Sequence, residues 1–325
     1  MNAYSDLARP LLFRLPPETA HRLTLASLRF PFIPRLLSGG VPAPEDPVEL
    51  MGLKFRNRLG IAAGVDKNAE ATLAWHELGF GFAELGTITL HAQPGNPKPR
   101  VFRFPSQQAL INRLGFPNLG AEAIAGRLRP FRERHSLKNF PIGINLGKSK
   151  ITPLHEASTD YLGSLRILHS LGDFFVINIS SPNTPGLRDL AKPEDLRRLL
   201  SALQEYNRSQ SSPDLEFSAL PEIVQATREF SLSGIVATNT TLHRANGDPA
   251  ENGGLSGRPL TDRALAITRA IRPLLSQGQV LIGVGGIMDA TDYQARRDAG
   301  ADLAQVYTGM VYLGPRTAWK ILKPS

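Results

Sequence analysis

The chain of 325 residues contains no cysteine and no long apolar run. The absence of cysteine excludes disulfide bonds, iron–sulfur clusters held by cysteine, and a cysteine nucleophile or base, and it agrees with a reducing compartment. No apolar run approaches the roughly 18–20 residues of a membrane-spanning helix, and we expect no secretory signal peptide. These absences favour a protein whose core and chemistry need neither disulfide bonds nor a transmembrane anchor.

Acidic side chains are fewer than basic ones, with 29 Asp and Glu against 37 Lys and Arg, which gives a net charge of +8. No basic stripe is interleaved with aromatic residues, so we predict no nucleic-acid partner. A solvated basic surface, or attraction to anionic lipid, is the preferred interpretation. Hydrophobic residues make up 42% of the chain, which allows a sizeable core, and the length suits one barrel of about 250 residues plus an extension.

Near-continuous apolar runs recur along the chain, and most are followed by helix-like segments. Such continuity indicates strands buried on both faces, as in a parallel sheet with crossover helices. The runs cover residues 60–64, 82–90, 142–146, 174–179, 234–241, 280–287 and 303–310. Small or polar residues gather at their carboxyl ends, which all face one mouth in a (β/α)₈ barrel, whereas a doubly wound sheet uses one switch point. We predict an α/β fold, a TIM barrel with a small N-terminal helical extension.

Seven runs are present where a closed barrel needs eight strands. Two helix-like segments, 193–207 and 218–230, follow the fourth run, and the connection between them contains no apolar run. A closed barrel cannot skip a strand without exposing two ladder edges. We therefore infer that one strand is missing near Ser212 and Pro213, through disorder, deletion or an incomplete chain, with a rearranged barrel as the alternative.

The first forty residues differ from the rest. Residues 4–15 and 17–30 read as two short helices bounded by prolines, each with apolar surface, and basic residues outnumber acidic ones there. A basic amphipathic pair can lie in a membrane interface without crossing it. The alternative is an ordinary cap packed against the barrel. We divide the chain into a helical extension, residues 1–40, and a barrel domain, residues 41–325.

The segment 178–186, NISSPNTPG, follows a buried-strand pattern and offers carboxamides and hydroxyls close together. Carboxamides provide donors and acceptors that suit a planar ring with alternating C=O and N–H groups, and a hydroxyl can take a proton if its surroundings help. An ordinary Asn/Ser/Pro turn is the alternative. Glycine-rich stretches at 283–287 and 307–309 end the last two strands, where many barrels bind phosphate. The stretch 253–259 adds a third glycine-rich loop on the same side, with a flexible excursion as the alternative.

Nine motifs occur in a specific order: MGLKFRNRLGIAAGVDKNAE, GFAELGTITLHAQPGNPKPRVFRF, INRLGFPNLG, GINLGKSK, NISSPNTPGLRDL, ATNTT, GGLSGRPL, GVGGI and QVYTGM. With them, the chain resembles the class 2, quinone-linked dihydroorotate dehydrogenases over nearly its whole length. The resemblance implies an FMN-containing (β/α)₈ barrel that oxidises dihydroorotate to orotate in pyrimidine biosynthesis and passes the electrons to a membrane quinone. The N-terminal helical pair is a hallmark of that class, so the resemblance favours its placement at a membrane.

The resemblance also implies roles for individual residues. Ser181 matches the catalytic base, which removes the C5 proton while hydride leaves C6, and class 1 relatives use Cys there. The substrate-binding positions are Lys67, Asn112, Arg113, Leu114, Gly115, Phe116, Asn178, Asn183, Asn239 and Thr240, of which 112–116 match a loop that closes over substrate. The FMN-binding positions are Ala63, Gly64, Val65, Asp66, Lys67, Thr87, Asn145, Asn178, Thr238, Gly257, Gly286, Tyr307 and Thr308. The quinone-site positions are His21, Arg103 and Tyr307. No metal site is implied.

One departure coincides with the missing strand. The family carries a V-K-I-A-P strand before the position of Pro213, with a lysine that contacts FMN, but here Ser212 precedes Pro213 directly. Two other functions therefore stay open: a non-enzymatic membrane-associated barrel that binds a phosphate-bearing ligand, and another FMN oxidoreductase. A hydroxy-acid oxidase would want a histidine base, so the Asn/Ser cluster argues against it.

The expected partners follow from the resemblance. They are dihydroorotate and orotate, a membrane quinone and a membrane surface, with no obligate protein partner. We expect a peripheral membrane protein on the cytoplasmic face of a bacterial inner membrane, or on the mitochondrial inner membrane if the source is eukaryotic.

Overall fold

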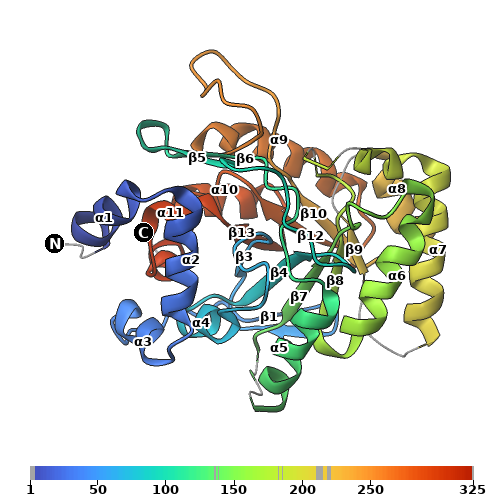
Figure 1. Cartoon of the computed structure of the whole chain (residues 1–325), viewed down its shortest axis with the longest axis horizontal. Helices are drawn as coiled ribbons and strands as arrows, with labels where there is room; N and C mark the ends of the chain where they lie inside the picture. Colours follow the sequence, from blue (N-terminus) through green and yellow to red (C-terminus); the bar gives the residue numbers. More distant parts are fainter. Residues whose placement is uncertain are drawn as a thin grey trace.

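A closed barrel of parallel strands forms the centre of the molecule (Figure 1). The computed structural model describes residues 4–134, 137, 139–181, 183–184, 186–209, 215–217 and 221–323. The barrel strands are β3 (Leu59–Ile61), β4 (Phe82–Ile88), β7 (Ile142–Leu146), β8 (Phe174–Ile177), β9 (Leu215–Phe217), β10 (Gly234–Ala237), β12 (Val280–Val284) and β13 (Leu303–Val306). Each strand pairs in parallel with the next, and β13 pairs with β3 to close the ring. The predicted TIM barrel is confirmed.

The fifth barrel strand corrects the strand count made from the sequence. Strand β9 pairs in parallel with β8, opposing Phe175 to Leu215, and with β10, opposing Gly234 to Glu216. The inference that a barrel strand is missing is therefore wrong. Three residues with a charged one in the middle make no apolar run, but a parallel ladder needs only backbone groups. Ser212 and Pro213 lie outside the described residues.

Helices surround the barrel and bury its outer face. They are α4 (Thr72–Glu77), α5 (Ala121–Arg134), α6 (Ala157–Leu168), α7 (Pro193–Ser209), α8 (Pro221–Glu229), α9 (Thr261–Ile271), α10 (Ala290–Asp298), α11 (Thr308–Leu313) and α12 (Thr317–Leu322). Helix α7 illustrates the pattern, because Leu196, Leu199, Leu200 and Leu203 recur at helical spacing and are all buried. The opposite face of α7 carries charged residues.

Phenyl rings fill the amino-terminal half of the barrel interior. Phe82 packs edge-on against Phe55, with ring centroids 5.6 Å apart, and lies 6.3 Å from Phe174. Glycines make room for these rings, since a Cβ on Gly60 would lie 2.5 Å from the Phe82 ring and one on Gly143 would lie 2.3 Å from Phe174. The hairpin of β1 (Val48–Leu50) and β2 (Leu53–Phe55) packs against this cluster. This end is closed, so a ligand must enter at the carboxyl ends of the strands.

The N-terminal segment forms three helices rather than two. After a π-helical turn (Tyr4–Ala8) come α1 (Arg9–Arg14), α2 (Pro17–Leu28) and α3 (Phe32–Ser38). In Figure 1, α1 and α2 lie beside α11, whereas α3 lies beside α4. Helix α3 was missed because prolines were taken as helix ends, whereas the first turn of a helix tolerates proline. The Tyr4 hydroxyl donates to the Val311 carbonyl at 2.6 Å, which ties the segment to α11. The domain division at residue 40 stays a prediction.

A small antiparallel sheet covers one side of the barrel mouth. It contains β5 (Val101–Phe104), β6 (Ala109–Asn112) and β11 (Gly254–Gly257), with β6 in the centre. Residues 254–257 were expected to lie in a glycine-rich loop, and they form β11 instead. Gly254 lies so close to Thr240 that a Cβ would be 1.9 Å from its hydroxyl oxygen, which explains the glycine at this strand position.

Candidate active site

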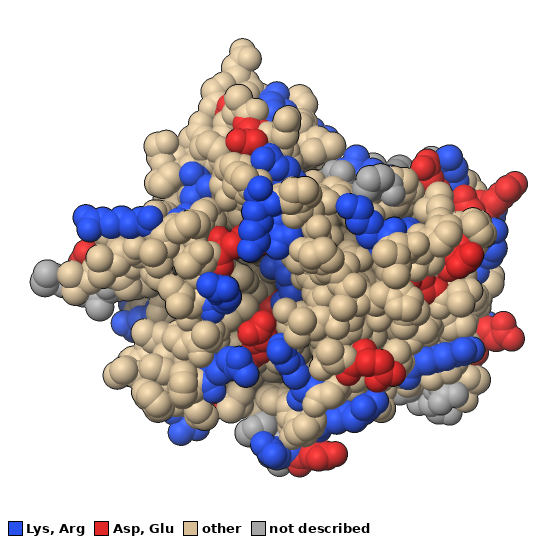
Figure 2. Space-filling view, in the orientation of Figure 1, with Lys and Arg blue, Asp and Glu red and all other residues tan. Residues whose placement is uncertain are grey.

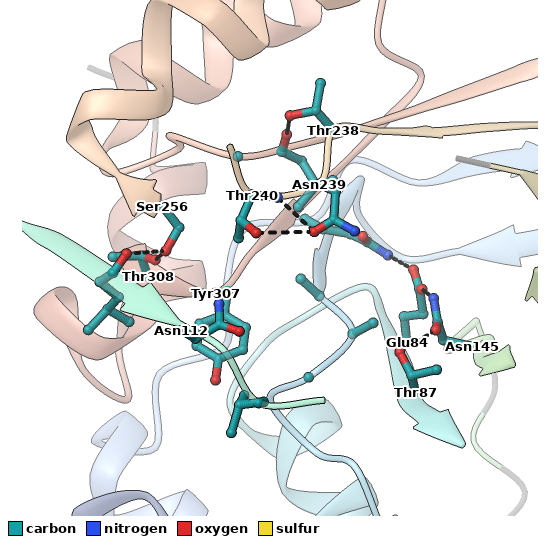
Figure 3. Close-up of a pocket in the computed structure, with 18 of the residues that line it drawn as sticks. Glu84, Thr87, Asn112, Asn145, Thr238, Asn239, Thr240, Ser256, Tyr307 and Thr308 are labelled. Atoms are coloured by element: carbon teal, nitrogen blue, oxygen red, sulfur yellow. Dashed lines mark hydrogen bonds between the residues drawn. The ribbon is translucent and has the colours of Figure 1, made fainter. Parts of the chain in front are cut away.

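A pocket opens at the carboxyl ends of the barrel strands, with the antiparallel sheet as one wall (Figure 3). The predicted substrate and cofactor residues that line it are Ala63, Gly64, Lys67, Thr87, Asn112, Leu114, Gly115, Phe116, Asn145, Asn178, Ser181, Asn183, Thr238, Asn239, Thr240, Gly257, Gly286, Tyr307 and Thr308. Barrel geometry explains this convergence, because the loops after parallel strands share one face. Ligand binding by these residues stays a prediction.

Two predicted cofactor residues lie behind the pocket. Val65 packs in the hydrophobic core. The fully buried Asp66 carboxylate accepts the backbone N–H groups of Glu70 at 2.7 Å and Ala71 at 2.8 Å, and the indole N–H of Trp75 at 3.1 Å. These bonds shape the turn that leads into α4. Asp66 therefore supports the segment that carries Lys67.

Lys67 brings a shielded positive charge into the pocket. Its Nζ donates to the Gly64 carbonyl at 2.6 Å. Burial lowers the pKa of Lys67 to about 8 and the charge of Arg100 acts in the same direction, while Asp66 and Glu18 raise it. At neutral pH the ammonium is charged but poorly solvated. It can therefore stabilise an anionic ligand strongly.

A buried hydrogen-bond network joins neighbouring strand ends (Figure 3). Thr87 donates its hydroxyl to Asn145 Oδ1 at 2.6 Å, and Asn178 Nδ2 donates to the same oxygen at 3.2 Å. Asn145 Nδ2 in turn donates to Glu84 at 2.6 Å, and Gln305 donates to the other Glu84 oxygen at 2.5 Å. Sequence reasoning gave no role to Glu84 or Gln305. The signal was present, since a charged residue inside an otherwise apolar parallel strand needs a polar partner.

The predicted base lies in the same pocket. Ser181 is 5% exposed, and its hydroxyl oxygen accepts the backbone N–H of Asn183 at 3.3 Å. Beside it, Asn239 Nδ2 donates to the Ser180 hydroxyl at 3.0 Å, and the Thr240 backbone N–H donates to Asn239 Oδ1 at 2.7 Å. The structure therefore brings a hydroxyl together with amides that can hold a planar ring.

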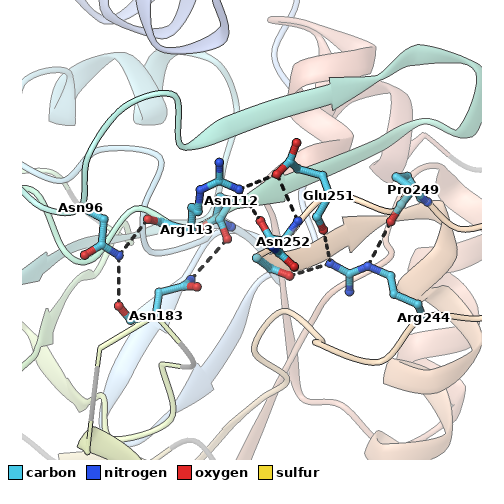
Figure 4. A network of polar contacts seen from close by, with 9 residues as sticks. Asn96, Asn112, Arg113, Asn183, Arg244, Pro249, Glu251 and Asn252 are labelled. Carbon is cyan, nitrogen blue, oxygen red and sulfur yellow. Dashed lines mark hydrogen bonds and ion pairs between the residues drawn. The ribbon is translucent and has the colours of Figure 1, made fainter.

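The loop after β6 is tied to two other loops (Figure 4). Arg113 does not line the pocket. Its guanidinium pairs with Glu251 at 2.6 Å and lies over the Phe102 ring at 4.6 Å. Asn96 donates to the backbone carbonyls of Arg113 at 3.0 Å and Asn183 at 3.2 Å. Arg113 therefore holds the predicted closing loop in place, and its contact with substrate stays a prediction.

The opposite end of the pocket offers hydroxyls and a glycine turn. The hydroxyls of Ser256 and Thr308 are 2.9 Å apart, at the left of Figure 3. Gly286 has a φ of +72° and lies in the Gly285–Gly286 turn after β12. Arg296, 1% exposed, donates to the Gly285 carbonyl at 2.8 Å and so holds this turn from behind. The combination is suited to an anionic group such as phosphate.

The three predicted quinone-site residues lie where the N-terminal helices meet the barrel: His21 is on α2, Arg103 contacts α1 and Tyr307 lines the pocket. A quinone site formed by them stays a prediction. Burial lowers the pKa of His21 to about 3 and the neighbouring charge of Lys67 acts in the same direction, so the imidazole is neutral at physiological pH. Tyr307 lines the pocket, and burial raises its pKa to about 12. Arg103 instead donates to backbone carbonyls at the carboxyl end of α1 and lies 4.5 Å from the Phe13 ring centroid. Arg103 thus anchors α1 on β5.

Two kinds of feature are absent from the part of the chain that the structure describes: a membrane-spanning helix and a cluster of metal ligands. No helix in this part of the chain has the length and apolar character needed to cross a membrane. Within the same residues, His, Asp and Glu side chains do not gather in groups of three or more that could hold a metal ion.

Comparison with known proteins places this chain in a family. The sequence model of the family described as dihydroorotate dehydrogenase matches residues 47–324. A relative named dihydroorotate dehydrogenase (quinone), from Gloeobacter violaceus, is 50% identical over 331 residues, covering 97% of this chain and 92% of the relative. A relative of the same name from Nostoc punctiforme is 44% identical over 352 residues, covering 99% and 93%.

A solved structure agrees with this assignment. The crystal structure of DHODH from Eimeria tenella in complex with ferulenol has a TM-score of 0.84 and 32% identity to this chain, covering 96% of this chain and 92% of that one. The resemblance drawn from the sequence motifs is confirmed. The chain therefore belongs to the dihydroorotate dehydrogenase family, in its quinone-dependent class, whose members are flavin-dependent oxidoreductases of pyrimidine biosynthesis.

Proposed function

We propose that this enzyme oxidises dihydroorotate to orotate with FMN as the hydride acceptor and a membrane quinone as the final electron acceptor. The observation that carries the proposal is the single pocket that combines Lys67, Ser181 and a cluster of amides with an anion-suited end. Bound FMN supplies a ring that takes a hydride from the substrate and yields electrons to the quinone.

The residues that line the pocket support the proposal of FMN as the cofactor. The Ser256 and Thr308 hydroxyls and the Gly285–Gly286 backbone can hold a phosphate. Asn145 and Asn178 can hydrogen-bond a ring edge that carries C=O and N–H groups. Aliphatic side chains line much of the rest and suit a flat ring: Ala62, Leu110, Val176, Val236, Val284 and Val306.

The chain's own residues carry the proton transfer and the positioning. Ser181 takes the C5 proton of dihydroorotate as hydride leaves C6. A serine hydroxyl is a weak base, so burial and a proton-accepting path must assist it. Asn112, Asn183 and Asn239 hold the ring and its carboxylate, so that C6 stays aligned for hydride transfer. Lys67 stabilises negative charge that arrives in the pocket.

The quinone is proposed to approach from the N-terminal helices. Figure 2 shows largely uncharged surface over these helices at the left, with Lys and Arg side chains around it. Leu11, Phe30, Phe32 and Leu36 are exposed by 62%, 58%, 64% and 73%. Apolar side chains bordered by basic ones suit the interface of an anionic membrane. Co-sedimentation with phosphatidylglycerol vesicles should be strong for the natural chain and much weaker for Leu36→Glu, and equal binding would contradict peripheral attachment.

Anaerobic mixing tests the catalytic proposal. The purified protein should carry a yellow flavin that bleaches with dihydroorotate and recovers its colour when a soluble quinone is added. A colourless protein that takes up no FMN, or a bound flavin that stays oxidised with dihydroorotate, would refute it. The hypothesis of a non-enzymatic barrel depended on the absent strand, and β9 removes that basis.

A further inference from the structure

A buried carboxylate lies at the centre of the pocket network without a role in the chemistry above. Glu84 is 1% exposed and lines the pocket. Its two oxygens accept hydrogen bonds from Asn145 at 2.6 Å and Gln305 at 2.5 Å. A buried carboxylate is costly unless such bonds satisfy it, so its presence at this position needs an explanation.

The hydrogen bonds around the mouth run in one direction and end on Glu84. Asn239 Nδ2 donates to the Ser180 hydroxyl at 3.0 Å, and that hydroxyl donates to Asn178 Oδ1 at 3.4 Å. Asn178 Nδ2 donates to Asn145 Oδ1 at 3.2 Å, and Asn145 Nδ2 donates to Glu84. The chain of bonds connects the ends of β10, β8, β7 and β4. Its members include the amides assigned to substrate and flavin.

Fixed groups set this direction at both ends. The backbone N–H groups of Thr240 and Ser180 donate to Asn239 Oδ1 at 2.7 Å and Asn178 Oδ1 at 3.3 Å, so these two amides are oriented by the main chain. For Asn145, the described hydrogen bonds include no such backbone donor, so side chains alone orient its amide: Asn178 Nδ2 faces its oxygen and Glu84 faces its nitrogen. An ionised carboxylate only accepts, so Glu84 requires the amide nitrogen of Asn145 to face it.

We propose that Glu84 is a positioning residue for the flavin and substrate site: its carboxylate fixes the amide of Asn145, which keeps Oδ1 toward Thr87 and Asn178 and leaves its second N–H for a bound ligand. The inference rests on the proposed function of the pocket. Burial is the larger effect and raises the pKa of Glu84 above its usual value, while the hydrogen bonds from Gln305 and Asn145 oppose that rise because they favour the accepting form.

FMN titration of the apoprotein, followed by flavin fluorescence, tests this role without requiring turnover. Glu84→Met keeps the side-chain shape but removes the acceptor, and it should weaken FMN binding by about tenfold or more. Glu84→Gln should stay within about threefold of the natural chain, because its oxygen can still accept from Asn145 while Gln305 rotates its amide to match. Asp160→Asn is the control, since that buried carboxylate accepts from Ser149 and Thr152 away from the pocket and should not affect FMN affinity.

Glu84→Asp tells whether FMN affinity depends on the position of the acceptor oxygen or on the negative charge. It also keeps the proposal testable if Glu84→Met fails to fold. It keeps the carboxylate but withdraws it by about 1.5 Å, one carbon–carbon bond, so FMN should bind more weakly than to Glu84→Gln. The proposal is supported if FMN affinity falls in the order natural chain, Glu84→Gln, Glu84→Asp. An order in which Asp exceeds Gln, or unchanged affinity in Met and Asp, overturns it. Failure of the natural chain itself to bind FMN would instead refute the proposed function.

Discussion

Lys67 gives the binding of an anionic ligand a pH dependence that can be worked out from its surroundings. Burial, partly offset by neighbouring carboxylates, lowers its pKa from 10.5 to about 8, which corresponds to a net cost of about 3 kcal/mol for the charged form. Orotate bound nearby would restore part of this energy only while the ammonium is charged. Between about pH 7 and about pH 9, the dissociation constant of orotate should therefore rise by up to about tenfold.

Titration calorimetry of the FMN-loaded enzyme with orotate measures this effect. Near pH 9, Lys67 of the natural chain should take up as much as about one proton when orotate binds. This uptake is measured by repeating the titration in buffers with different ionisation enthalpies, because the heat of binding then changes from buffer to buffer. Lys67→Met should bind orotate more weakly at pH 7 and show no such proton uptake. A natural chain whose orotate affinity is flat across this range, or a Met variant with the same slope, would refute the reasoning.

The stability of the apoprotein provides a second check with a defined sign. Below about pH 8 the folded and unfolded chains both keep Lys67 protonated, and folding bears the full cost of burying the charge. Between about 8 and 10.5 only the unfolded chain holds the proton, so this group makes the unfolding free energy rise with pH. Urea unfolding should show that Lys67→Met loses this rise relative to the natural chain.

Three further variants test the site and the N-terminal segment. Ser181→Ala should slow flavin reduction by dihydroorotate by about 10²- to 10⁴-fold in stopped flow while FMN stays bound, and loss of FMN would contradict its role. Arg113→Met removes the pair with Glu251 that ties down the loop after β6, and it should raise KM for dihydroorotate more than it lowers kcat; an unchanged KM would count against that role. Glu18→Ala leaves the Arg100 guanidinium, whose side chain is 8% exposed, without the carboxylate 3.0 Å away, and it should loosen α2 by about 1–3 kcal/mol. Hydrogen exchange in α2 should quicken and quinone-linked turnover should fall, with flavin reduction unchanged; equal exchange would argue against the docking role.

Continuous apolar runs were sufficient to predict the barrel. They reveal strands buried on both faces, and seven of the eight barrel strands lie where such runs predicted them. The motifs at the strand ends also predicted most of the pocket lining, because parallel strands of a barrel deliver their carboxyl ends to one mouth.

The remaining features depend on contacts between distant segments. Strand β9 owes its place to backbone pairing with β8 and β10, which leaves little trace in side-chain hydrophobicity. The contacts of Arg103 also depend on the fold, since only the folded chain brings its guanidinium against the end of α1. Glu84 shows the reason most clearly: a local pattern marks a buried charge, but the donors that satisfy its carboxylate come from Asn145 and Gln305, on two other strands.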